Sequence, residues 1–370
     1  MNYIAEKLFK LRVSVFYAFF SFFVITILSI LYFSLIDVTS PSYVTHDSIY
    51  YNELSKEHCA DPLVLFSDAF KDLGFGGLNW VTIVSIGSVA CAISNEYSDV
   101  LVLIINLVAL FLTLMLYSSL IGCFRGKKRW VKLFYLLFVL QLFLYINMVS
   151  LNKEIYSFFI VSLFLYLFLE NKKTWLFIAG IFFSILKIQF FPISIILLLC
   201  LYGVRLRYVI VGLSLVLPII YWVYNPAFLS AEIYFARYEN IRTEGLAVVL
   251  NEISKYPLGY VVVLPFKMLI TLLSGLSPIR ITSVDSVYAL GYQFNAVLFS
   301  VTVFSVVIRG VWRGVKLNKK IAQFVFAYSA VICLLPFFQL RYFLPIFPVI
   351  WMLFSNVRSV SQVNKSTSEL

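Results

Sequence analysis

The chain of 370 residues is 62% hydrophobic and 18% aromatic, and only 13% of its residues are Asp, Glu, Lys or Arg. A soluble domain carries about 25% charged residues, so this composition excludes a soluble globular enzyme. The formal net charge of +11 comes from basic residues that form no continuous arm, which argues against a nucleic-acid-binding protein. The remaining class is an all-α polytopic membrane protein in contact with the lipid bilayer.

Apolar runs of about 20 residues indicate membrane spans, because about 30 Å of hydrocarbon needs a helix of that length. The run at 13–36 is too long for a signal-peptide core, so we expect it to remain as the first span. The run at 175–204 is too long for one span, and Lys187 and Pro192 at its middle predict two short helices that turn near Phe190. The sequence therefore predicts about ten spans, at 13–36, 99–123, 133–150, 155–170, 175–204 (two), 208–224, 286–308, 321–338 and 342–357.

Two further apolar runs, 79–94 and 256–276, are interpreted from the placement of charge. Cytoplasmic loops collect Lys and Arg, and every basic cluster falls on the cytoplasmic side only if neither run crosses singly. We therefore expect both to be interfacial or re-entrant segments covered by protein or a water-filled cavity. Both chain termini are then cytoplasmic. The basic clusters lie at 125–129, 172–173, 205–207 and 309–320.

Residues 1–370 are expected to form a single membrane domain that acts at its outer face. Two outer segments, 37–98 and 225–285, are long, whereas the cytoplasmic connections are short. Long loops in compact proteins are usually functional unless they are disordered, and the aromatic and apolar content of these two predicts order. Residues 358–370 form a cytoplasmic tail.

The cysteines and histidines give no sign of a metal centre. The five cysteines share no metal-binding spacing, and a free cysteine in lipid behaves as a small hydrophobe, so we expect neither disulfide nor metal roles for them. His46 and His58 are the only histidines and have no defined spacing to carboxylates. We expect no cofactor.

Several short motifs resemble known membrane glycosyltransferases. Residues 47–51, Asp-Ser-Ile-Tyr-Tyr after the first span, resemble the start of enzymes of the GT-C architecture, which use lipid-linked sugars. Residues 152–154, the segment 264–278, and residues 341–345, Arg-Tyr-Phe-Leu-Pro, are similar to parts of O-antigen polymerases of the Wzy type. The spacing of arginine and glycine known from the outer loops of Wzy-type proteins is not found in this chain.

The resemblance implies an O-antigen polymerase of the bacterial inner membrane, in lipopolysaccharide biosynthesis. Such an enzyme transfers a glycan from undecaprenyl pyrophosphate to a lipid-linked repeat unit at the periplasmic face, with a chain-length regulator protein as a further partner. The alternative is a GT-C-type enzyme that transfers one sugar from a polyprenyl phosphate, and the residues do not separate the two. A flippase or transporter fits less well, because the chain shows no repeat and its charges lie at the ends of spans.

Basic residues on the outer side are the first candidates for the site. A pyrophosphate leaving group gains negative charge in the transition state, so fixed cations beside it are the main catalytic device. Arginine suits this role because its planar fork donates two parallel hydrogen bonds to phosphate. Cations near lipid are costly, which favours a functional interpretation. We expect Arg341 to be catalytic and the substrate-binding cations to be Lys153, Lys187, Arg237, Arg242 and Arg280.

The acceptor hydroxyl needs a base, which we expect among the acids of the first outer segment. Asp47 is the leading candidate because GT-C-like enzymes place an acid there, and Glu53 is a second, substrate-binding candidate. Each has a structural alternative: Asp47 also suits the N-cap of a helix that begins near Ile49. Lys153 could likewise serve only to pair with Glu154, its neighbour in the chain.

Overall fold

The computed structural model is built from helices packed side by side. Within the residues that it describes, every regular element is a helix, as the composition predicts. The described residues are 2–44, 46–57, 59, 82–91, 93–94, 98–122, 128–223, 249–250, 253, 256, 258–273, 286–312, 318–333 and 340–354.

The helices follow the predicted apolar runs closely. Their bounds are α1 Asn2–Leu35, α2 His46–Glu57, an unlabelled helix Thr82–Cys91, α4 Asp99–Gly122, α5 Lys128–Val139, α6 Leu142–Met148, α7 Lys153–Leu169, α8 Lys173–Ser184, α9 Phe190–Leu201, α10 Leu206–Val223, α13 Gly259–Leu273, α15 Val287–Trp312, α16 Lys319–Ile332 and α17 Phe347–Trp351. Three short 3-10 helices, η2 Leu340–Tyr342, η3 Leu344–Ile346 and η4 Met352–Phe354, flank α17.

Three of the described helices are long and apolar enough to cross a membrane: Val13–Leu35 in α1, Asp99–Ile121 in α4 and Val287–Ser305 in α15. A fourth is obtained if α5 and α6 together form one bent span. The outward face of α1 carries bare aromatic rings, with Phe16 63% and Phe23 62% exposed. An exposed apolar face of this extent suits contact with lipid rather than water.

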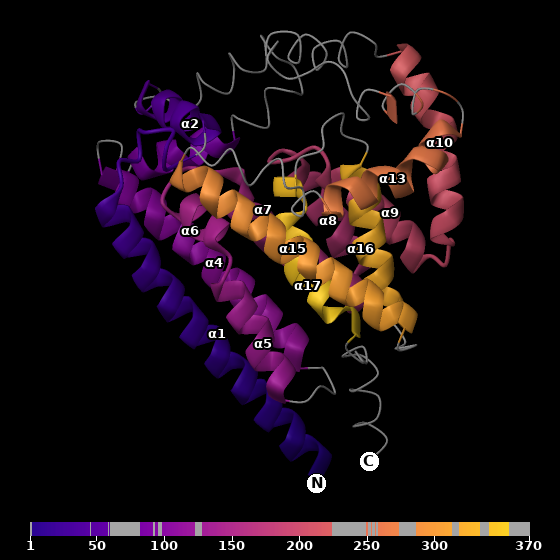
Figure 1. Ribbon diagram of the computed structural model, residues 1–370, viewed down its shortest axis with the longest axis horizontal. Helices are drawn as coiled ribbons and strands as arrows, with labels where there is room; N and C mark the ends of the chain where they lie inside the picture. Colours follow the sequence, from indigo (N-terminus) through magenta and orange to yellow (C-terminus); the bar gives the residue numbers. More distant parts are fainter. Residues whose placement is uncertain are drawn as a thin grey trace.

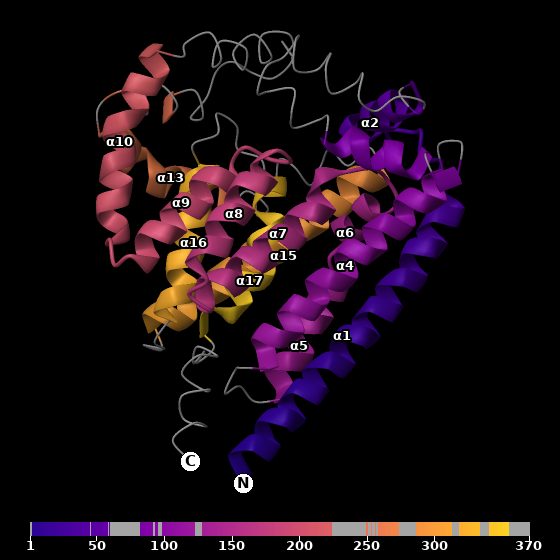
Figure 2. The same ribbon diagram turned by 180° about the vertical axis from the view of Figure 1, so that it is seen from behind.

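The helices form two groups with α7 and α15 between them. Helices α1, α4 and α5 lie side by side on one flank, and α8, α9, α10, α13 and α16 gather on the other, as the two opposite views agree (Figures 1 and 2). Helix α2 lies at the end of α1 that is remote from the N-terminus (Figure 1). The Phe134 ring joins α4, α5 and α17, with centroids 5.3 Å from Tyr117 and 5.7 Å from Trp351.

The predicted span 133–150 is two helices rather than one. Helices α5 and α6 meet at an angle of 55° around Leu140 and Gln141. The break leaves the Val139 carbonyl at a helix end, and the Tyr145 hydroxyl donates a hydrogen bond to it at 2.6 Å. In lipid, a break of this kind is tolerated only when a side chain satisfies the freed backbone group.

The predicted last span, 342–357, also differs from a continuous helix. Its described part consists of η2, η3, α17 and η4. Pro345 and Pro348 are the second residues of η3 and α17, within the first turn of each. A proline lacks the backbone N–H that a continuing helix needs but suits a first turn, so each proline favours the start of a new element.

Helices α8 and α9 confirm the prediction of two short helices that turn near Phe190. They are joined by residues 185–189 and pack closely as an antiparallel pair. A Cβ atom added at Gly180 of α8 would collide with the side chain of Ser194 of α9. Glycine is therefore required at this position because the two helix backbones approach each other closely.

A disulfide between Cys59 and Cys91 overturns the expectation that the cysteines form none. It ties the segment after α2 to the end of helix Thr82–Cys91, and the Ser55 hydroxyl donates to the Val84 carbonyl at 3.4 Å across the same contact. Sequence spacing could not indicate the pair, because a separation of 32 positions between the two cysteines matches no metal or redox motif.

The close contact between α8 and α9 gives a stability test. We expect Gly180→Ala to lower the thermal unfolding temperature in detergent by several degrees, because Ser194 must move and overpacking costs about 1–3 kcal/mol. Gly212→Ala in α10 is the matched control, since an added Cβ there meets nothing within 4 Å. Equal unfolding temperatures for the two variants would contradict the close helix contact.

Candidate functional site

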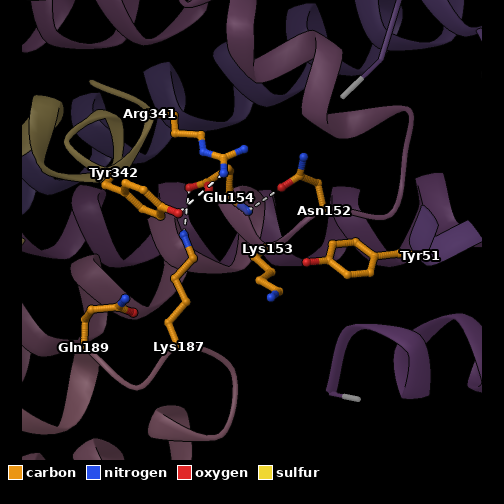
Figure 3. A pocket seen from close by; sticks show the side chains of 8 residues that line it. All are labelled: Tyr51, Asn152, Lys153, Glu154, Lys187, Gln189, Arg341 and Tyr342. Carbon is orange, nitrogen blue, oxygen red and sulfur yellow. Dashed lines mark hydrogen bonds and ion pairs between the residues drawn. The ribbon is translucent and has the colours of Figure 1, made fainter. Parts of the chain in front are cut away.

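A polar cavity of about 100 Å³ lies among the ends of several apolar helices. This volume holds several water molecules, and therefore a group with the bulk of a phosphate. Three of the side chains around it are cationic and one is a carboxylate, so the described lining carries an excess of positive charge. The lining residues are Tyr51, Asn152, Lys153, Glu154, Lys187, Gln189, Arg341 and Tyr342 (Figure 3).

The central contact of the cavity is an ion pair between Lys187 and Glu154. The Lys187 Nζ lies 2.9 Å from the Glu154 Oε2, and the two side chains are only 10% and 6% exposed. Lys187 comes from the connection between α8 and α9, whereas Glu154 lies in the first turn of α7. Two buried charges are tolerated here because each neutralises the other.

Two cationic side chains lie against the ring of Tyr342. The Lys187 Nζ and the Arg341 guanidinium carbon each lie 5.2 Å from the ring centroid, within the range of a cation–π contact. The Tyr342 backbone carbonyl is fixed in turn by the Tyr328 hydroxyl of α16, at 2.7 Å. Lys187 and Arg341 thus both lie against the ring of Tyr342, and Lys187 also pairs with Glu154.

Lys153 provides the third cation at another side of the cavity. Its Nζ lies 5.1 Å from the ring centroid of Tyr51, which is a buried residue of α2. Figure 3 shows Tyr51 facing Lys153, away from the Lys187–Glu154 pair. The two tyrosines therefore arrange cations at separate parts of the lining.

Hydrogen bonds hold the start of α7 in place. The Asn152 side chain caps α7 by accepting from the Glu154 N–H at 3.1 Å, while its Nδ2 donates to the Ser48 Oγ of α2 at 3.1 Å. From α4, the Asn106 Nδ2 donates to the Ser150 carbonyl at 3.0 Å. Glu154 itself lies in the first turn of α7, at the positive end of the helix dipole.

The structure brings together three of the predicted site residues, Lys153, Lys187 and Arg341. Asp47 lies in the first turn of α2, next to Ser48, and its side chain lies outside the described residues. Glu53 is exposed on α2 and is not part of the lining. The remaining candidates, Arg237, Arg242 and Arg280, also lie outside the described residues.

Glu154 is the main residue of the cavity that the sequence interpretation missed. The sequence suggests Glu154 only as a partner for its neighbour Lys153, but its ion pair is with Lys187, 33 residues along the chain. The side chains of adjacent residues in the first turn of a helix point in different directions, so adjacency in the sequence is a poor guide to ion pairing. The sequence does carry one signal for this pair. An acidic residue at the start of an apolar run is a costly charge, so it needs a partner of opposite charge.

Within the described part of the chain, no three His, Cys, Asp or Glu side chains gather in a way that could hold a metal ion. Comparisons of the chain with protein-family models, with curated proteins and with solved structures find no match. The geometry and charge of the cavity are therefore the basis for assigning it a function.

The buried ion pair predicts a strong coupling in stability. Lys187→Met leaves the Glu154 carboxylate buried without its counter-ion and should lower the free energy of unfolding by about 3 kcal/mol. Adding Glu154→Gln to Lys187→Met removes the stranded charge and should recover at least half of that loss. Denaturation in mixed detergent micelles measures both; additive losses in the double variant would show that the pair is not coupled.

Proposed function

We propose that this chain is a membrane glycosyltransferase of the O-antigen polymerase type. It transfers a glycan from undecaprenyl pyrophosphate to a lipid-linked repeat unit at the periplasmic face of a bacterial inner membrane. The observation that carries the proposal is the cavity among apolar helices, whose described lining residues include the three cations Lys153, Lys187 and Arg341 and one carboxylate, Glu154.

Cations of this kind are the chemistry that pyrophosphate departure needs. The bond from the anomeric carbon to the pyrophosphate oxygen breaks, and the electron pair leaves with that oxygen. Fixed positive groups stabilise the developing charge without any reorganisation, and they act most strongly where water is excluded. Arg341 suits this role because its guanidinium stays charged and binds two phosphate oxygens at once.

The position of the cavity supports action at one membrane surface. The cavity lies at the N-terminal end of α7, and the 17 residues of that helix extend over about 25 Å. At its other end, the Lys320 Nζ donates to the Asn171 Oδ1 at 3.1 Å, within the basic clusters predicted to be cytoplasmic. A site at a surface rather than at the bilayer midplane also favours a transferase over a transporter.

The disulfide supports an outer location for the same end of the molecule. Helix α2 contributes Tyr51 to the cavity and is followed by Cys59, which is bonded to Cys91. Disulfides persist in the oxidising periplasm and are rare in the reducing cytosol. The helix order then suits about ten spans with cytoplasmic termini in a GT-C-like arrangement, with helix Thr82–Cys91 and α13 as the re-entrant segments.

The location of the disulfide can be tested directly. Membranes from cells lysed in the presence of an alkylating reagent should yield a peptide in which Cys59 remains joined to Cys91 in the absence of reductant, as measured by mass spectrometry. Cys200, which is a half-buried free thiol, should carry the alkyl group in the same sample. Alkylation of Cys59 and Cys91 without reductant would argue for a reducing compartment.

Loss of the leaving-group cation should abolish polymer formation. We expect Arg341→Ala to insert in the membrane at normal levels but to form no long glycan, a loss of at least a hundredfold in rate. The matched control is Arg207→Ala, since Arg207 is an exposed residue at the start of α10 that donates a hydrogen bond to the hydroxyl of its neighbour Tyr208 at 3.1 Å. Normal chain lengths with Arg341→Ala would contradict the proposal.

The glycolipids of a deletion strain separate the polymerase from the alternative that transfers one sugar. A polymerase deletion leaves complete single repeat units on the lipid carrier, whereas loss of a single-sugar transferase leaves a truncated repeat. Mass spectrometry of the extracted lipids distinguishes the two. Unaltered glycolipids and unaltered chain lengths would exclude both functions.

A further inference from the structure

We propose that Glu154 is a catalytic base that substrate binding releases from Lys187. This inference rests on the proposed function and assigns a second step to the same cavity. In the absence of substrate, Lys187 and Glu154 neutralise each other at 2.9 Å. When a phosphate group of the donor lipid enters, Lys187 binds the phosphate and Glu154 becomes available to the acceptor hydroxyl.

A buried carboxylate is unexpected in a cavity that binds an anion. A site that only binds an anion gains nothing from a buried carboxylate, which repels the anion and occupies one of its cations. Arg341 and Lys187 share the Tyr342 ring at 5.2 Å each, so a phosphate beside that ring can contact both. The phosphate then replaces Glu154 as the counter-ion of Lys187.

The supporting elements show which partner of the pair moves. Glu154 belongs to the first turn of the 17-residue helix α7, and its N–H is fixed by the Asn152 cap at 3.1 Å. Lys187 stands in the short non-helical connection between α8 and α9, on a long flexible side chain. We therefore expect the ammonium group to swing toward the phosphate while the carboxylate stays in place.

Glu154 stays at the cavity wall after Lys187 has turned away. It belongs to the first turn of α7, and Arg341 and Lys153 line the same cavity. A carboxylate that is no longer held by an ammonium group can accept the proton of a hydroxyl within hydrogen-bond reach.

The resulting step is balanced in atoms and charge. The acceptor hydroxyl oxygen forms a bond to the anomeric carbon of the donor glycan, and its proton passes to the Glu154 carboxylate. The bond between the anomeric carbon and the pyrophosphate oxygen breaks, and its electron pair stays on the pyrophosphate. Departure of the lipid pyrophosphate lets Lys187 return to Glu154 after the proton has been lost to water.

The test is Glu154→Gln in the full-length protein in lipid nanodiscs, with two measurements. Binding of undecaprenyl pyrophosphate should tighten about tenfold, because Lys187 no longer has a competing carboxylate. Glycan transfer from the lipid-linked repeat unit should fall at least a hundredfold. Glu170→Gln is the matched control at the opposite end of α7 and should change neither value.

The two measurements separate the possible failures. Normal transfer by Glu154→Gln, or weaker lipid binding by both Glu154→Gln and Glu154→Asp, overturns the release of a base and leaves the polymerase assignment intact. Tight lipid binding shows in addition that the variant is folded. If the deletion strain makes normal glycan, the proposed function itself fails, and this inference fails with it.

Discussion

The arrangement of the site depends on the ion pair between Lys187 and Glu154. A lysine and a glutamate among apolar helices would each be excluded if the other were absent, because removal of an isolated charge from water costs several kcal/mol. The pair therefore requires the α8–α9 connection and the start of α7 to meet. Arg341 and Tyr342, which open the last segment, line the cavity at that junction.

Much of the fold could be predicted from hydrophobicity alone. Helices α1, α4, α7, α8, α9, α10, α15 and α16 lie within or close to the predicted apolar runs, and among them α1, α4 and α15 contain segments long and apolar enough to cross a bilayer. The bend between α5 and α6 could not be predicted, since the hydrogen bond from the Tyr145 hydroxyl to the Val139 carbonyl has no sequence signature. The Cys59–Cys91 disulfide likewise depends on how α2 and its neighbouring helix pack.

The cations of the site could be predicted from the sequence, but its carboxylate could not. Lys153, Lys187 and Arg341 can be predicted because each is a costly charge within or beside an apolar run, and the structure brings all three to one cavity. Glu154 is equally costly, but the sequence offered a cation beside it, and proximity along the chain suggested the wrong partner. Asn106 and Ser48, which hold the start of α7, have no sequence signature because their role is visible only in contacts between helices.

The contacts of Lys153 with the Tyr51 ring and of Arg341 with the Tyr342 ring affect how a substrate is captured. An aromatic ring attracts a cation through its quadrupole and leaves the formal charge of that cation intact. Lys153 on Tyr51 and Arg341 on Tyr342 are therefore oriented without being neutralised by these rings. Their field extends into the adjoining water layer over roughly one Debye length, about 8 Å at physiological ionic strength. Recruitment of an anionic lipid headgroup should accordingly slow as ionic strength rises, while the rate of the chemical step inside the cavity stays the same.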